Sequence, residues 1–145
     1  MPEPKEQKMT ADEINAFLDE HFPQMNSRTT RFIVERAWGR SVQMRMHFSD
    51  RMLRPGGTIS GPAIFGLADV AMYAAVLAMV GPKALAVTSN LNINFLRRPK
   101  PADMIGVATI LKLGKRTAVG EIAMRSDGED ELAAHATSTY AIPQE

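Results

Sequence analysis

The feature that most constrains this chain is an unbroken apolar segment, 61–80, whose only charged residue is Asp69. Twenty residues make a helix about 30 Å long, and a helix that is apolar on every side must be covered on every side. A lone carboxylate on such a helix is costly to bury unless it is paired or used. The sequence therefore predicts a buried central helix that carries one polar group in need of a partner.

A glycine-rich loop, 54–62, leads into this segment. The helix start at Gly61 and Pro62 offers backbone N–H groups without helical acceptors and the positive end of the helix dipole. Such a start can stabilise developing negative charge. Together with Asp69 it supplies the minimum that acyl-transfer chemistry requires.

The composition excludes several classes of function. The chain has 145 residues and a formal net charge of +1, which suits one domain with a real core and gives no reason to expect a nucleic-acid or membrane-surface partner. Without cysteine there are no disulfides, thiol nucleophiles or thiolate ligands. The three histidines lack metal-ligand spacing, so we expect no metal. The polar, mixed-charge start of the chain has no leader pattern, and we expect a cytoplasmic protein.

Segment 61–80 is long enough to cross a bilayer, but its aspartate and six alanines favour a buried helix.

The remaining elements follow from local patterns. Residues 1–9 are predicted to form a flexible tail and residues 10–145 a single domain. Thr10 and Glu13 have the spacing of a capping box, so a helix begins there, and Pro23 ends it. Alternating apolar residues and turn signals predict strands at 29–38, 40–48, 85–96, 104–113, 117–124 and 132–142. Because the last four strands follow one another through short turns, we expect an antiparallel meander curled around the central helix.

Three motifs occur in order along the chain: 57–69, Val87-Thr88-Ser89-Asn90-Leu91-Asn92-Ile93-Asn94-Phe95-Leu96-Arg97-Arg98-Pro99, and Gly114-Lys115-Arg116. Together they resemble the hotdog-fold acyl-CoA thioesterases, above all the phenylacetate-pathway (PaaI-like) group, over residues 41–142. The resemblance implies an α+β hotdog fold, an antiparallel sheet wrapped around a long central helix, here with an extra N-terminal helix. It also implies hydrolysis of an acyl-CoA without a cofactor, since CoA is part of the substrate.

The resemblance assigns three catalytic roles. It implies that Asp69 is the nucleophile or general base, that the Gly61 N–H is the oxyanion donor, and that Thr88 is an assisting hydroxyl. Ser60 and Pro62 depart from the His-Gly-Gly-like sequence of the family. Pro62 has no N–H but fits a first helical turn, so the Gly61 donor is retained. The alternative for Asp69 is a structural carboxylate that caps backbone or makes a subunit contact. The alternatives for the other two are a proline-started helix without a catalytic role and an ordinary strand threonine at 88.

The expected substrate-binding residues are mostly cationic. An arginine at 54 can bind an acyl carboxylate or a CoA phosphate, and clustered basic side chains can hold phosphates; solvated loop charges are the alternative. Phe65, with Met72, Tyr73 and Met79, could line an acyl tunnel or pack in the core. The full set of expected substrate-binding residues is Arg54, Ser60, Phe65, Arg97, Arg98, Lys115 and Arg116.

Geometry adds a prediction about assembly. Gly61 and Asp69 lie eight residues apart, hence about 12 Å along a helix, yet one thioester carbonyl must lie about 3 Å from both. Two helices that run antiparallel about a twofold axis can meet this condition. We therefore expect a homodimer with shared sites, and the resemblance adds a tetramer of two dimers.

Two other functions remain as alternatives to acyl-CoA hydrolysis. One is a non-catalytic acyl-CoA-binding or ligand-sensing hotdog protein, and the other is an enoyl-CoA hydratase, which usually needs a His–Asp pair.

Overall fold

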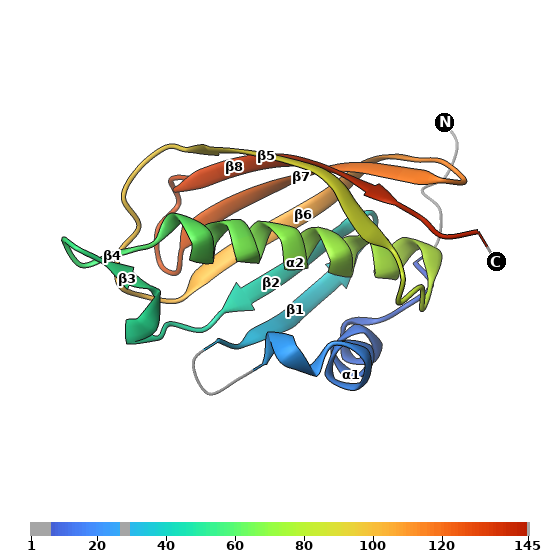
Figure 1. The fold of residues 1–145 in the computed structure, drawn as a ribbon, viewed down its shortest axis with the longest axis horizontal. Coiled ribbons are helices and arrows are strands. Elements are labelled where there is room, and N and C mark those ends of the chain that lie inside the picture. The colour runs from blue at the N-terminus through green and yellow to red at the C-terminus, as the bar shows by residue number, and fades with distance from the viewer. Residues whose placement is uncertain (1–6, 27–29, 145) are drawn as a thin grey trace.

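The structure, a computed structural model, describes residues 7–26 and 30–144. An N-terminal helix precedes two strands, a long helix follows a short glycine-rich hairpin, and four strands complete the chain (Figure 1). In chain order the elements are α1 (Ala11–His21), η1 (Pro23–Met25), β1 (Phe32–Trp38), β2 (Ser41–Met46), η2 (Asp50–Met52), β3 (Leu53–Arg54), β4 (Thr58–Ile59), α2 (Gly61–Val80), β5 (Val87–Phe95), β6 (Met104–Leu113), β7 (Thr117–Ser126) and β8 (Ala134–Ala141).

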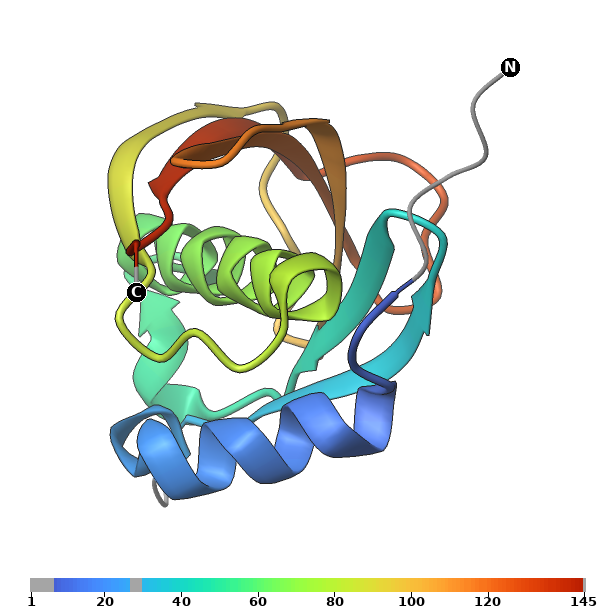
Figure 2. The same cartoon turned by 90° about the vertical axis from the view of Figure 1, so that its right-hand side faces the viewer.

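The six long strands form one antiparallel sheet in the order β1-β2-β6-β7-β8-β5. Viewed along α2, the sheet curls around the helix from β1 to β5 (Figure 2). This arrangement confirms the predicted hotdog architecture. The expected four-strand meander is wrong in one respect, because only β6, β7 and β8 follow one another as neighbours. β2 occupies the edge of β6 that β5 would need, and β5 pairs with β8 at the far edge of the sheet instead.

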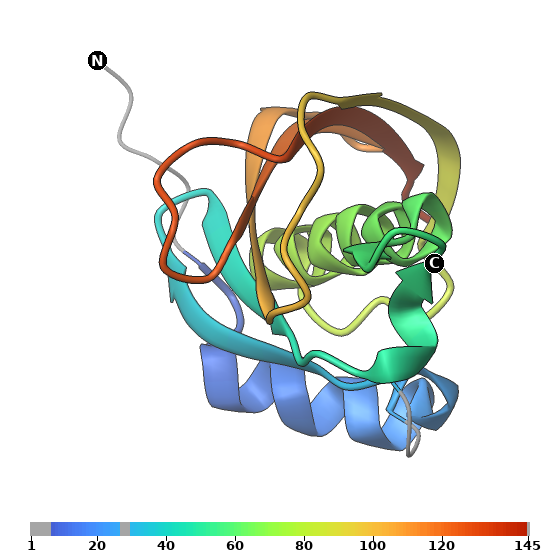
Figure 3. The same cartoon turned by 90° about the vertical axis from the view of Figure 1, so that its left-hand side faces the viewer.

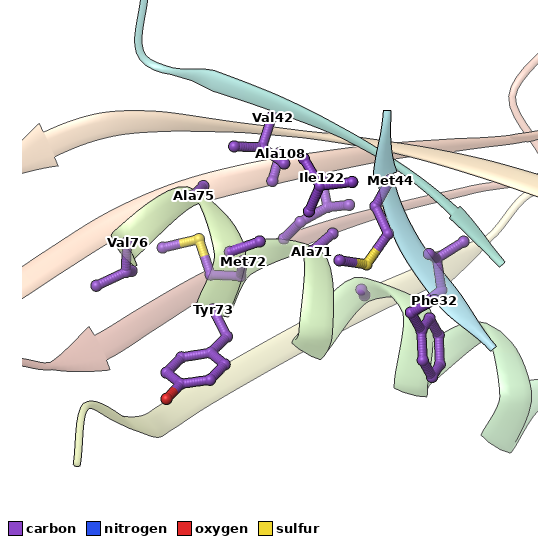
Figure 4. Close-up of a cluster of buried hydrophobic side chains, with 14 of the residues drawn as sticks. Phe32, Val42, Met44, Ala71, Met72, Tyr73, Ala75, Val76, Ala108 and Ile122 are labelled. Carbon is purple, nitrogen blue, oxygen red and sulfur yellow. The ribbon is translucent and has the colours of Figure 1, made fainter. Parts of the chain in front are cut away.

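Helix α2 forms the centre of the core, and twelve of its residues are buried. Buried side chains from α2 and the sheet interlock at its middle (Figure 4). The close packing depends on Gly120 of β7, where an added Cβ would lie 2.7 Å from Met72 Sδ and 2.8 Å from the Thr109 carbonyl oxygen. By length and hydropathy α2 could cross a membrane, but 67% of its apolar window is buried inside the fold, as the predicted core helix requires.

The two edge strands of the sheet, β1 and β5, differ in what covers their outer sides. Helix α1 begins with the predicted capping box between Thr10 and Glu13 and packs below β1 (Figure 2). The side-chain amide of Asn15 donates to the Val34 carbonyl at 2.9 Å and accepts from the Val34 N–H at 2.8 Å. Asn15 thereby satisfies free backbone groups on the outer edge of β1. The opposite edge strand, β5, has no neighbour on its outer side within the described chain.

The boundary of the predicted N-terminal tail needs correction. The Lys8 N–H donates to the Ala78 carbonyl at 2.8 Å, and Met9 is buried. Packed structure therefore begins before residue 10, because Met9 joins the core beside α1. Residues 1–6 of the predicted tail and Thr29 of the first predicted strand lie outside the described residues, and β1 begins at Phe32.

Candidate active site

Asp69 lies in the middle of α2 and faces the β5–β8 edge of the sheet. Its Oδ1 accepts hydrogen bonds from the Thr88 hydroxyl at 2.5 Å and from the Tyr140 hydroxyl, whose oxygen lies 2.9 Å away. Tyr140 Oη also lies 3.1 Å from the Asp69 carbonyl oxygen. These donors compensate the half-buried carboxylate. The contact with Thr88 brings together two residues that the sequence analysis placed in one site.

Tyr140 was missed by the sequence analysis. It is 3% exposed, and burial raises its pKa well above the usual tyrosine range, with the neighbouring Asp69 charge acting in the same direction. The hydroxyl therefore keeps its proton at neutral pH and remains a donor. Its strand neighbour across the pair is Thr88, so β5 and β8 present their hydroxyls to Asp69 side by side. The inward alternation of Ala136, Ser138 and Tyr140 was a usable signal, but the β5–β8 pairing was not predicted.

The pairing of β5 with β8 is irregular directly after Thr88. Thr88 pairs with Tyr140 and Asn90 with Thr139, so Ser89 is an extra residue in the ladder. The Ser89 hydroxyl donates to the Thr139 carbonyl at 3.2 Å. Bulges of this kind re-aim neighbouring side chains and are frequent beside active sites.

A cavity of about 290 Å³ opens beside the carboxylate. Three aromatic rings wall it: the Phe22 and Tyr73 rings meet edge-on with centroids 6.2 Å apart, and those of Tyr73 and Tyr140 stack at 6.0 Å. His21 also lines it. Asp69 Oδ2 accepts no hydrogen bond from residues 7–26 or 30–144. The carboxylate is thus held through one oxygen, while the other is available to a bound molecule.

A second cavity, of about 400 Å³, lies at the start of α2. Gly61 lines it, and the Gly61 N–H donates to no acceptor in the part of the chain that the structure describes. Arg54, Arg97 and Arg98 line it as well. The β3–β4 hairpin, which contains Arg54, lies beside the start of α2 (Figure 3). Arg97 pairs with Glu131. The free N–H, the helix dipole and the arginines make this end of the site suited to anionic groups.

The remaining predicted residues lie apart from these two cavities. Lys115 and Arg116 occupy the β6–β7 turn, and Lys115 lines a cavity of about 720 Å³ at the opposite end of α2. Ser60 caps α2 by accepting a hydrogen bond from the Ala63 N–H at 3.4 Å. Phe65 is 42% exposed on the helix surface, whereas Met72 and Met79 are in the core. One chain therefore does not bring all the predicted residues together.

No three His, Asp or Glu side chains of the described residues are grouped so that they could hold a metal ion.

Comparisons with known proteins identify the family of the chain. The sequence model of the Thioesterase superfamily matches residues 56–133. A candidate esterase of Saccharolobus solfataricus is 30% identical over 103 residues, 71% of this chain and 67% of that protein. The crystal structure of a candidate thioesterase from Silicibacter sp. TM1040 is 42% identical, covers 97% of this chain and 96% of its own, and superposes with a TM-score of 0.88.

The PaaI protein of the Escherichia coli phenylacetic acid degradation operon shares the fold at 21% identity, with a TM-score of 0.69 over 78% of this chain and 80% of its own. The structure and the family match support one conclusion. This chain belongs to the thioesterase superfamily and is a thioester hydrolase.

Proposed function

We propose that the protein hydrolyses an acyl-CoA to a free acid and CoA at two equivalent sites shared across a homodimer. The observation that carries the proposal is the location of Gly61 and Asp69 on one continuous helix. They are about 12 Å apart along its axis, whereas one carbonyl must lie about 3 Å from both the oxyanion donor and the attacking group. Gly61 of the partner subunit therefore completes the site around Asp69.

The proposed reaction uses the two oxygens of Asp69 differently. Thr88 and Tyr140 hold Oδ1, and Oδ2 does the chemistry. As a general base, Oδ2 takes a proton from the water that attacks the thioester carbon. As a nucleophile, Oδ2 attacks that carbon itself, and water then hydrolyses the resulting anhydride. In both routes the C–S bond breaks, the CoA sulfur takes up a proton, and the Gly61 N–H stabilises the carbonyl oxygen as it becomes negative.

The edges of the sheet support the dimer. An open strand edge is a template for pairing with another chain, and proteins usually block it. Here Asn15 satisfies the N–H and C=O of Val34 on the outer edge of β1. By contrast, β5 is nine residues long, contains neither proline nor a charged residue, and lies exposed. Pairing of two β5 strands about a twofold axis is the assembly that these features favour. It would also cover Thr88, which is exposed in the single chain.

The same twofold arrangement accounts for the separated basic residues. Antiparallel α2 helices put the start of one beside the end of the other. Lys115 and Arg116 of one chain are then on the same side of the dimer as Arg97 and Arg98 of its partner. We assign these residues, with Arg54, to the phosphate groups of CoA, because clustered arginines and lysines bind phosphate by charge-assisted hydrogen bonds.

The test is release of free CoA thiol from acetyl-, octanoyl-, phenylacetyl- and succinyl-CoA by the wild type and by Asp69→Asn. We expect release by the wild type and loss of at least a hundredfold in Asp69→Asn, with the dimer intact by sedimentation. Asp130→Asn makes the same chemical change on the exposed β7–β8 connection and should leave the rate unchanged. A folded wild-type dimer that releases no thiol from any substrate would refute hydrolysis and favour acyl-CoA binding.

Enoyl-CoA hydration is the second candidate. It is favoured by one observation: His21 and Asp69 line the same cavity, and hydration usually needs such a pair. Adding crotonyl-CoA to the panel distinguishes the reactions. Loss of the enoyl absorbance without thiol release would indicate hydration, whereas thiol release indicates hydrolysis.

A further inference from the structure

A third cavity, of about 500 Å³, adjoins the Asp69 cavity on the other side of Phe22 and Val70, which line both. It lies between α2 and the layer formed by η1, β1 and η2. Its lining is mainly apolar and includes Met25, Met46 and Met52, and the exposed Arg51 lines it as well. Flexible methionine side chains adapt to occupants of different shape. This third cavity, here called the chamber, and the Asp69 cavity therefore lie next to each other, divided by the side chains of Phe22 and Val70.

The floor of this chamber is one face of α2, on which Pro62, Ala63, Gly66 and Val70 follow one another at helical spacing. Within the single chain, neither backbone conformation nor packing requires glycine at 66. Its φ is not positive, and an added Cβ would meet no atom within 4 Å. Glycine inside a helix is destabilising relative to alanine. Gly120, by contrast, is required by packing. The absence of a side chain at 66 keeps the chamber open.

We infer that this chamber binds the hydrocarbon part of a medium-chain acyl group, an inference that rests on the proposed function. From Asp69 to Pro62 is seven residues, about 10 Å along α2 and about eight carbon–carbon bonds. A cavity of this size is within the range of small-ligand sites. Its mainly apolar lining matches an alkyl chain, whose transfer out of water is favourable. Phe22 and Val70 flank the chain where it leaves the carboxylate.

The test fills the chamber from Gly66. Acyl-CoAs from two to twelve carbons are assayed with the wild type, Gly66→Ala and Gly66→Leu. We expect the wild-type kcat/KM to rise with chain length to about eight carbons. Gly66→Leu should lose tenfold or more on octanoyl-CoA and less than threefold on acetyl-CoA. Gly66→Ala, which adds one methyl group to open space, should be at least as stable as the wild type and show a smaller loss confined to the longest chains.

A binding measurement separates this inference from hydrolysis itself. In the Asp69→Asn background, calorimetry should show octanoyl-CoA binding at least tenfold more tightly than acetyl-CoA, and adding Gly66→Leu should remove the difference. Equal losses at all chain lengths in both Gly66 variants would overturn the chamber and leave the proposed hydrolysis intact. Chain-length-dependent binding without any turnover would refute the proposed hydrolysis and retain the chamber.

Discussion

The proposed shared site predicts complementation between two inactive variants. Asp69→Asn removes the proposed attacking group. Gly61→Pro removes the proposed oxyanion N–H donor, and the local structure at Gly61 tolerates the change. Ser60 has φ −70° and ψ 153°, the extended geometry that proline requires of the residue before it. The Gly61 N–H has no acceptor in the described chain. Proline is favoured in a first helical turn, so no structural hydrogen bond is lost.

The expected magnitudes follow from counting sites. Loss of one oxyanion donor lowers kcat about 10² to 10³-fold, so homodimers of either variant should retain about 1% of wild-type activity or less. Random pairing of co-expressed chains makes about half the dimers mixed, and each mixed dimer has one site with Gly61 from one chain and Asp69 from the other. About a quarter of wild-type activity per total protein is expected.

The assay is thiol release by co-expressed chains that carry different affinity tags, so that purification through both tags isolates mixed dimers. Purified mixed dimers should show about half of wild-type activity, because one of their two sites is intact. Gly61→Ala is the matched control. It keeps the N–H, and its Cβ would lie 3.6 Å from Phe95 Cζ, an ordinary contact, so it should remain active. If each site lay within one protomer, every site in the mixed dimer would carry one defect. Activity near 1% in pure, stable mixed dimers would therefore refute the reasoning.

Three further predictions concern groups around the site and the core. Tyr140→Phe removes one donor to Asp69 Oδ1; a hydrogen bond to a charged group is worth about 1.5–3 kcal/mol, so kcat/KM in the thiol assay should fall about tenfold or more. Burial raises the pKa of Tyr140 and of Tyr73, so above pH about 10 the folded state binds more protons than the unfolded state. The two tyrosines should therefore contribute their full share to the free energy of unfolding, measured by urea titration, below that pH. This free energy should fall as pH rises above it, more steeply in the wild type than in Tyr140→Phe. Gly120→Ala should lower the free energy of unfolding by about 1–3 kcal/mol, because its Cβ would meet the Thr109 carbonyl; an unchanged urea midpoint would contradict the packing argument.

Features encoded within one segment were predictable from the sequence. The capping box of α1 depends on Thr10 and Glu13 alone, and the length and start of α2 follow from 61–80 and the residues before it. The partnership of Thr88 with Asp69 was expected only through the family resemblance. These predictions needed no knowledge of which strands pair.

Features that depend on competition between segments were not predictable. Whether β5 pairs with β6 or with β8 depends on which strand takes the free edge of β6, and β2 takes it. Tyr140 was missed for this reason, since its place beside Thr88 exists only in the β5–β8 ladder. The β3–β4 hairpin was expected only as a loop, although Gly56 and Gly57 adopt the positive φ of a tight turn. That turn carries Arg54 to the cavity at Gly61.

The asymmetry of the sheet edges connects the fold with the chemistry. A side chain can protect an edge strand by satisfying its backbone groups, and Asn15 does this at Val34 of β1. The chain leaves β5 without such protection at the strand that carries Thr88, beside the helix that carries Asp69. A fully protected sheet would keep Asp69 and Gly61 about 12 Å apart on one helix, each with half of the required groups. In the proposed dimer, the open edge of β5 is the part of the fold through which a second chain completes the site.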